Sequence, residues 1–485
     1  MDNDKTVFQN FESSEGQNVP VEPVTSSVPP VLPESPQPFV SSSPAPVPQE
    51  NGKPGSSIVK KVFRIFIGVL VIFVLFSILF FIVLPNLSKN QGGVTLKYWG
   101  LWEDSKVMQG IISDFERDNK NIKIEYIKQD IKQYRETLAT RINNGTGPDV
   151  FRFHNTWYPM LSKDLLPLPS DTISKADFAK NFYPVAQKDL IKNGAIYGIP
   201  LEIDTLALFI NTQLFQSAGL NPPVTWNDFT NDARILTTKD DKGIIHTAGA
   251  ALGTYDNITH APDIISLLFL QNLVDPYALK ASSDRGADAL NFYSSFAIDS
   301  NNVWDNTLDP SILAFSKGNL AMYFGYSWDY YTIKQQSPNM AFQIVPVPQL
   351  PDRNIAMASY WAEGASVKST HQREAFLFLK YLARKDVAEK LYADEAKERT
   401  FGEPYARVDL AGTLKQNQNL YPFVQQASFA YSSFFADSTY DNGLNQQSNT
   451  YLGDAVNSIL DGGSSQSAFD TLTNGVLQVL HKYGQ

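Results

Sequence analysis

The chain has 485 residues, a length that suits two or three domains or one group of domains with appendages. Its formal net charge of −10 and the lack of a long basic run argue against nucleic-acid binding, which needs a concentrated positive patch. Cysteine is absent, which excludes disulfides, thiolate metal sites, thiol nucleophiles and a lipid attached to an N-terminal cysteine.

Residues 1–57 are rich in proline and serine and contain few large apolar side chains. Such a segment buries too little apolar surface to offset the entropy lost on ordering, so we predict a disordered tail with polyproline II character. A Pro-rich stretch also suits an SH3-like ligand, although a plain flexible tail is the simpler interpretation.

A long apolar stretch follows the tail, and from Ile65 to Leu84 it is uncharged over 20 residues. Twenty helical residues at about 1.5 Å each cross the hydrocarbon core of a bilayer, which is roughly 30 Å thick. A buried core helix would show a polar face, and a cleaved signal peptide would have a shorter apolar region nearer the N-terminus. We therefore predict a transmembrane helix over 62–85.

The charges beside this stretch predict its orientation. Lys60, Lys61 and Arg64 precede it, and only Lys89 follows closely. Because positive charge is retained on the cytoplasmic side, the tail is expected in the cytoplasm. The sequence thus predicts a single-pass protein of the cell membrane whose globular part, 94–485, lies on the extracytoplasmic face.

The globular part opens with alternating strand and helix patterns, which predict a doubly wound α/β sheet. Strands are predicted over 94–102, 122–127 and 148–153, and helices over 103–119 and 133–145. From about residue 367 onward, helix-like segments dominate.

The stretch "YGIPLEIDTLALFIN", residues 197–211, is predicted to be one apolar strand that carries two acids, Glu202 and Asp204. Side chains two apart in a strand point to the same face, so both acids face the same way. Glycosidases place two carboxyl groups about 5 to 10 Å apart across the scissile bond, so an extracytoplasmic glycoside hydrolase is one hypothesis. The sequence contains no Rossmann, P-loop, zinc-protease or nucleophile-elbow motif, and we expect no cofactor and no metal.

Six segments of the globular part follow one another in a characteristic order: "VTLKYWGLW", "FERDNKNIKIEYI", "NGTGPDVFRFHNTW", "YGIPLEIDTLALFINTQLFQSAGLNPPVTWNDF", "FSKGNLAMYFGYSW" and "VPVPQLP". In this order they resemble the carbohydrate-type extracellular solute-binding proteins of ABC importers (extracellular solute-binding protein family 1), typified by maltose-binding protein. The lipid-bearing cysteine that is usual in that family is missing, and the predicted span stands in its place.

The resemblance implies an α/β fold of the periplasmic-binding-protein type II-like kind, in which a hinge joins two lobes and the ligand binds between them. The chain is expected to cross between the lobes near 200–206 and 345–351. The expected lobes are 94–203 with 352–395 for the first, and 204–346 with 396–485 for the second.

The resemblance also places the ligand beyond the carboxyl ends of strands, where aromatic and polar side chains gather. A sugar offers apolar faces to aromatic rings and hydroxyls to charged or amide groups. The stacking candidates are Trp102, Trp157, Tyr326, Trp328 and Trp361. The polar candidates are Glu103, His154, Asn155, Glu202, Asp204, Glu363 and Arg399. Each residue type also has a structural use, since tryptophan fills cores and a carboxylate suits a helix N-terminus.

Three hypotheses for function follow. The first, implied by the resemblance, is a membrane-tethered, monomeric substrate-binding component that binds a sugar or oligosaccharide and delivers it to an ABC permease. The second is the hydrolase that uses Glu202 and Asp204. The third, compatible with the first, is a sensor or scaffold that signals through the Pro-rich tail.

Overall fold

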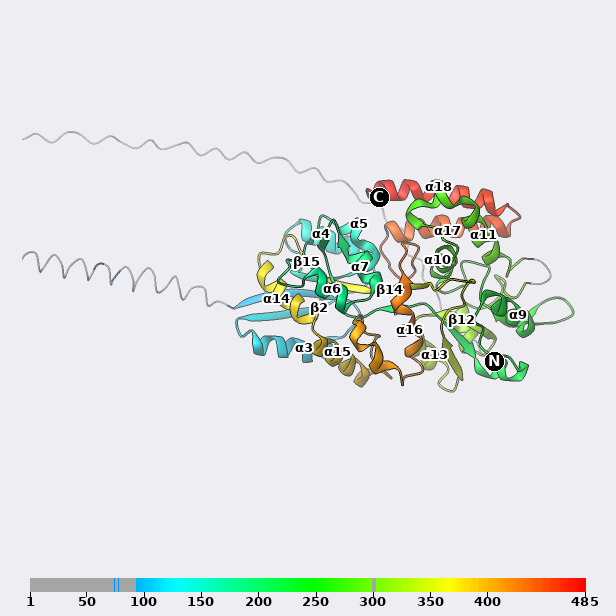
Figure 1. The fold of residues 1–485 in the computed structure, drawn as a ribbon, viewed down its shortest axis with the longest axis horizontal. Helices are drawn as coiled ribbons and strands as arrows, with labels where there is room; N and C mark the ends of the chain where they lie inside the picture. The colour runs from blue at the N-terminus through cyan, green and yellow to red at the C-terminus, as the bar shows by residue number, and fades with distance from the viewer. Residues whose placement is uncertain (1–73, 75–76, 78–92, 299–301) are drawn as a thin grey trace, which may run out of the picture. The chain divides into compact units, whose positions relative to one another are not determined.

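The computed structural model describes residues 93–298 and 302–485, together with Val74 and Ser77 (Figure 1). The predicted tail over 1–57 lies outside the described residues, and so does the predicted span over 62–85 apart from those two positions. None of the described helices is long and apolar enough to cross a membrane. The chain divides at Val83, and the description below concerns the unit from Leu84 to Gln485.

The first sheet has the strand order β2-β1-β3-β15-β4, and β7 also pairs with β15. Strands β1, β2 and β3 run parallel, whereas β15 is antiparallel to β3. The strands of this sheet are β1 Val94–Gly100, β2 Ile122–Lys128, β3 Val150–His154, β4 Leu165–Leu166, β7 Ile199–Pro200 and β15 Trp361–Ser366. The three strands predicted at the start of the globular part are therefore confirmed.

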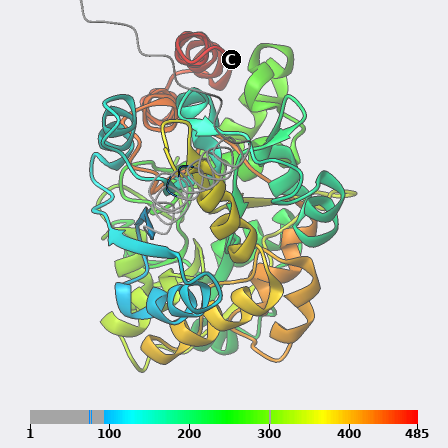
Figure 2. The ribbon, with the colours of Figure 1, turned by 90° about the vertical axis from the view of Figure 1, so that its left-hand side faces the viewer.

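Helices on this sheet follow the apolar spacing of their sequences. In α3 (Ser105–Asp118), Val107, Met108, Ile111 and Phe115 form the buried face. Helix α15 lies beside α3 in both views (Figure 1, Figure 2), and Lys106 pairs with Glu398 between them at 2.6 Å. The other helices in this part of the chain are α4 Tyr134–Asn143, α5 Tyr158–Leu161, α6 Lys175–Asn181, α7 Pro184–Leu190, α14 Gln372–Leu382 and α15 Lys385–Glu398.

The second sheet has the strand order β10-β11-β12-β9-β13. Its strands are β9 Ala207–Asn211, β10 Thr238–Lys239, β11 Ile245–Ala250, β12 Leu320–Gly325 and β13 Phe342–Val345. Trp226 begins α9, where Thr225 and Asp228 form a capping box, and its ring stacks on Phe324 of β12. The helices of this region are α8 Thr212–Ala218, α9 Trp226–Leu236, α10 Ala261–Gln271, α11 Ser283–Ser294, α12 Ser311–Ser316 and α13 Asp329–Gln336.

A small third sheet has the order β16-β14-β8, and its strands β8 and β14 lie in the segments that connect the two larger sheets. Its strands are β8 Asp204–Thr205, β14 Ala356–Ser359 and β16 Ala430–Tyr431. The first crossing falls within the predicted range of 200–206, while the second extends beyond the predicted 345–351 to Ser359.

The prediction of one continuous strand over 197–211 is wrong, because the stretch forms β7, β8 and β9 in three different sheets. Its backbone changes partner repeatedly: Pro200 pairs with Ala362, Glu202 forms a bridge with Tyr405, and β8 pairs with β14. Apolar content alone does not reveal these changes of partner.

Helices dominate the last part of the chain, as predicted. Helices α17 and α18 pack against each other and against α11. The remaining elements are η3 Asn155–Trp157, β5 Ile191–Lys192, β6 Ala195–Ile196, η4 Pro276–Ser282, η5 Val408–Leu414, α16 Tyr421–Gln426, η6 Ala427–Phe429, α17 Leu444–Leu460 and α18 Ser465–Lys482.

Candidate functional site

A cleft of about 380 Å³ lies where the ends of β1, β3 and β12 meet the crossing segments. The predicted site residues that line it are Trp102, Glu103, His154, Glu202, Asp204, Trp328, Trp361 and Arg399. The lining residues that the sequence did not suggest are Ile131, Ile203, Ser359, Tyr360, Glu403, Asp437, Ser438 and Tyr440. The cleft is therefore lined by aromatic rings and by several carboxylates.

The other predicted site residues are buried behind the cleft wall. Trp157 is fully buried, and its ring meets Trp361 edge to face at 5.1 Å. Asn155 donates through Nδ2 to Asp189 at 2.9 Å. Tyr326 and Glu363 are likewise bonded to neighbours, at Asp263 and Arg152, and none of these four side chains is part of the cleft lining.

Two aromatic groups shape the cleft. Trp328 stacks on Tyr326 with ring centroids 4.4 Å apart and planes 17° apart, and Tyr326 is fixed by donating its hydroxyl to Asp263 at 2.7 Å. On the other side, Trp361 meets Trp102 edge to face at 5.5 Å, and Trp102 is 43% exposed. Both groups present ring surface that is held in place by packing.

A buried ion network lies beneath Glu103. The Arg152 guanidinium, 1% exposed, contacts Glu363 Oε1 through Nε and Glu103 Oε2 through Nη1, each at 2.6 Å. Glu202 Oε2 lies farther away, at 3.9 Å from Arg152. Arg152 and Glu363 are register partners on β3 and β15, so the pairing of these strands sets the geometry.

A second ion network lies beside the first. Arg399 contacts Glu395 Oε2 at 3.0 Å and Glu403 Oε1 at 2.7 Å. Burial raises the pKa of Glu395 to about 7, although the Arg399 guanidinium opposes the change. Burial and the neighbouring Glu103 carboxylate hold the pKa of Glu202 well above its usual range.

Asp204 and His154 are engaged in fixed contacts. Asp204 accepts hydrogen bonds from the backbone N–H of Ser327 at 2.7 Å and of Thr205 at 2.8 Å. The bond to Ser327 connects β8 to the loop after β12. His154 contacts Ser359 Oγ at 3.0 Å, and burial lowers its pKa to about 3, so its imidazole is neutral.

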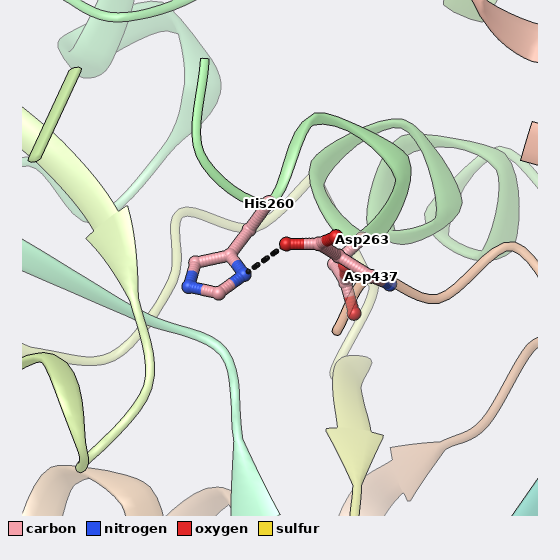
Figure 3. A group of neighbouring side chains, drawn as sticks. All are labelled: His260, Asp263 and Asp437. Atoms are coloured by element: carbon pink, nitrogen blue, oxygen red, sulfur yellow. Dashed lines mark hydrogen bonds and ion pairs between the residues drawn. The ribbon is translucent and has the colours of Figure 1, made fainter. Parts of the chain in front are cut away.

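The loop that contributes Asp437, Ser438 and Tyr440 is anchored by His260 (Figure 3). His260 Nδ1 lies 3.1 Å from Asp437 Oδ2, and its Nε2 lies 2.9 Å from Asp329 Oδ2. Burial opposes protonation, but these two carboxylates raise the pKa of His260 well above its ordinary value. A protonated imidazole has no lone pair for a metal, so the group of His260, Asp263 and Asp437 is best explained as an ion-pair anchor.

No motif identifies this loop in the sequence. The backbone has positive φ at Ser438, Tyr440 and Asn442, a conformation that asparagine adopts more readily than serine or tyrosine. The loop follows β16, and its approach to the cleft depends on the tertiary path of the chain.

The folded chain is expected to gain stability when the pH falls from about 8 to about 6. Glu202 and Glu395 have raised pKa values in the folded state, so their charged forms at the higher pH disfavour folding. Protonation removes that penalty as the pH falls through the folded pKa. His260 acts in the same direction, because stability from a raised histidine pKa is lost as the pH rises through it.

Chemical denaturation at the two pH values measures this gain, of which Glu395 alone should supply about 1 kcal/mol. The variant Glu395→Gln should show a smaller gain, whereas Glu398→Gln, on the exposed end of α15, should match the parent. A parent protein that is more stable at the higher pH would contradict the assignment.

Comparisons with known proteins agree with this architecture. Residues 99–389 match the family described as bacterial extracellular solute-binding protein. The multiple sugar-binding protein of Streptococcus mutans is 25% identical over 322 residues, which are 63% of this chain and 74% of that protein.

Two solved structures share the fold. An ABC transporter solute-binding protein from Thermotoga lettingae, bound with alpha-D-tagatose, has a TM-score of 0.61 and 21% identity over 80% of this chain and 100% of that one. The sugar-binding protein MalE from Xanthomonas citri has a TM-score of 0.66 and 19% identity over 80% of this chain and 98% of that one. These neighbours are two-domain proteins with mixed α/β structure.

The family match covers more than half of the chain. The family consists of substrate-binding proteins and not of enzymes, so it assigns no catalytic role to Glu202 and Asp204. The family also implies that the binding domain lies outside the cytoplasm. The resemblance noted in the sequence is thus confirmed, and the chain belongs to the bacterial extracellular solute-binding protein family.

Proposed function

We propose that this chain binds a sugar or oligosaccharide in the cleft and delivers it to the permease of an ABC importer. The observation that carries the proposal is the combination, in one cleft, of supported aromatic rings with carboxylates and a guanidinium. The Streptococcus mutans relative is named for binding multiple sugars, and the Thermotoga lettingae structure holds a sugar, which supports the same class of ligand.

The cleft supplies both kinds of contact that a sugar needs. The Trp328 ring, backed on one face by Tyr326, offers its other face to the apolar side of a pyranose. Carboxylates such as Glu202 and Glu403 accept hydrogen bonds from hydroxyls, and Arg399 donates them. Fixed rings lose little conformational entropy when a ligand binds.

A hinge between two lobes completes the proposed mechanism. The lobes would be 94–203 with 352–395, and 204–346 with 396–485, and strands β8, β14 and β16 would form the hinge. Closure around the ligand bends only a few residues at such crossings. Asp204, which bonds across to Ser327, lies at the first crossing and would stabilise the closed arrangement.

The predicted span over 62–85 would tether the binding domain to the membrane, with the tail of 1–57 in the cytoplasm. A tether keeps the local concentration of the receptor near its permease high without any additional contact.

Calorimetry of the full chain in detergent against a panel of mono- and oligosaccharides tests the proposal. We expect heat of binding from at least one sugar, together with a rise in the thermal midpoint that grows with its concentration. The absence of both effects across the panel, with a folded protein, would overturn the proposal.

A further inference from the structure

The lining of the cleft holds more carboxyl groups than cationic groups. Its lining includes the carboxyl groups of Glu103, Glu202, Asp204, Glu403 and Asp437. Only Arg399 contributes a permanent positive charge to that lining. His154, which also lines the cleft, is neutral because burial lowers its pKa to about 3.

Most of these carboxyl groups already have a partner. Glu403 pairs with Arg399, Asp437 lies against His260, and Asp204 accepts two backbone N–H groups. Glu103 forms an ion pair with the Arg152 guanidinium. Glu202 is the exception, because its single ion-pair contact among the described residues is the 3.9 Å approach to Arg152.

Three carboxyl groups converge at one point beside the cleft. Glu103, Glu202 and Glu395 each place a carboxylate oxygen within 4.8 Å of the other two. Glu395 is 2% exposed, and its Oε1, like Oε1 of Glu202, has no hydrogen-bond partner in the described part of the chain. Buried carboxylate oxygens without a partner are costly and call for a donor.

We propose that the ligand of this cleft is an amino sugar whose protonated amine binds to Glu103, Glu202 and Glu395. This inference rests on the proposed function and names the class of sugar. A primary ammonium group has three N–H donors, which matches three converging carboxylates. Glu103 and Glu202 line the cleft, so an amine on the sugar reaches them from the cleft side while Glu395 contributes from behind.

A divalent metal fits this group less well than an amine. The Arg152 and Arg399 guanidiniums contact Glu103 and Glu395 at 2.6 and 3.0 Å, so a doubly charged ion would lie close to two fixed positive charges. Calcium also takes six to eight oxygen ligands, and this group offers three carboxylates, two of which are already bound to arginine.

The experiment is calorimetry of the full chain with short glucosamine oligosaccharides, their N-acetylated counterparts and glucose oligosaccharides of the same length. Calcium and magnesium salts are titrated alone as a separate arm. The test variant is Glu202→Gln, which keeps the shape of the side chain and removes its charge. The matched control is Glu398→Gln, since Glu398 is 44% exposed and pairs with Lys106 on the surface.

The parent protein should prefer the free amine to the N-acetylated sugar, and Glu202→Gln should reduce that preference by about 10- to 100-fold. The control should keep the preference of the parent. An equal loss of affinity for both sugars would show that Glu202 binds hydroxyls. Binding of calcium or magnesium alone that is lost in Glu202→Gln would assign the three carboxylates to a metal ion. Either result overturns the inference.

The two proposals fail in different ways. If neutral sugars bind and a free amine on the sugar does not increase the affinity, the inference is wrong and the proposed function stands. If no sugar binds at all while the protein is folded, both are wrong. The thermal midpoint of Glu202→Gln without ligand reports its folding, and it should equal or exceed that of the parent, because burial and the neighbouring Glu103 raise the pKa of Glu202 and make its charged form unfavourable.

Discussion

Replacing Arg152 with methionine is expected to lower the free energy of unfolding by about 3 to 5 kcal/mol. Arg152 is 1% exposed and bonds to Glu103 and Glu363, and Glu363 is fully buried. Without the guanidinium, the Glu363 carboxylate is left in a low-dielectric environment with no opposite charge. Breaking a buried pair by removing one partner costs far more than the pair itself contributes.

Urea denaturation of the parent, Arg152→Met and Arg152→Met/Glu363→Gln measures the effect. The double variant should recover part of the loss, because the orphaned charge is removed with its partner. The control is Arg117→Met, since Arg117 is 66% exposed in a surface pair with Asp114. A loss for Arg152→Met no larger than that of the control would contradict the proposed role of the network.

The elements that the sequence predicts best are those whose pattern is local. The strand of β1 shows alternating burial of Leu96 and Tyr98, and α3 shows its apolar residues at helical spacing. These periods of two and 3.6 residues are visible without knowledge of the tertiary structure. The strand over 197–211 fails for the opposite reason, because its partners come from residues more than a hundred positions away.

The same distinction applies to the site. Trp102, Glu103 and Trp328 follow strand ends directly, where the family resemblance places the ligand, and all three line the cleft. Tyr440 and Asp437 come from a loop whose position depends on the ion pair with His260, and that pair joins segments far apart in the chain.

Arg152 is a feature of the sequence that points to a buried ion pair. It is the only permanently charged residue in "VFRFH", a strand whose every side chain is buried. A charge in such a strand requires a buried partner, and Glu363 in "WAEGAS" has the same character. A lone charge in each of these apolar strands is a reason to look for an ion pair between them, and the structure places that pair behind the cleft lining.

Trp328→Ala is expected to weaken binding of the sugar by about 2 kcal/mol, or about 30-fold in Kd. Trp328 lines the cleft and rests on Tyr326 at 4.4 Å, so its ring is held in place before any ligand arrives. Alanine removes the ring and leaves the face of Tyr326 uncovered. Trp328→Phe should retain most of the affinity, because a phenyl ring still offers a stacking face.

Calorimetry with the tightest-binding sugar compares the three proteins, and the thermal midpoint without ligand shows that each is folded. A ring that serves only to pack against Tyr326 would lower the midpoint of Trp328→Ala and leave Kd unchanged. A ring that stacks on the ligand changes Kd in the order tryptophan, phenylalanine, alanine, from tightest to weakest.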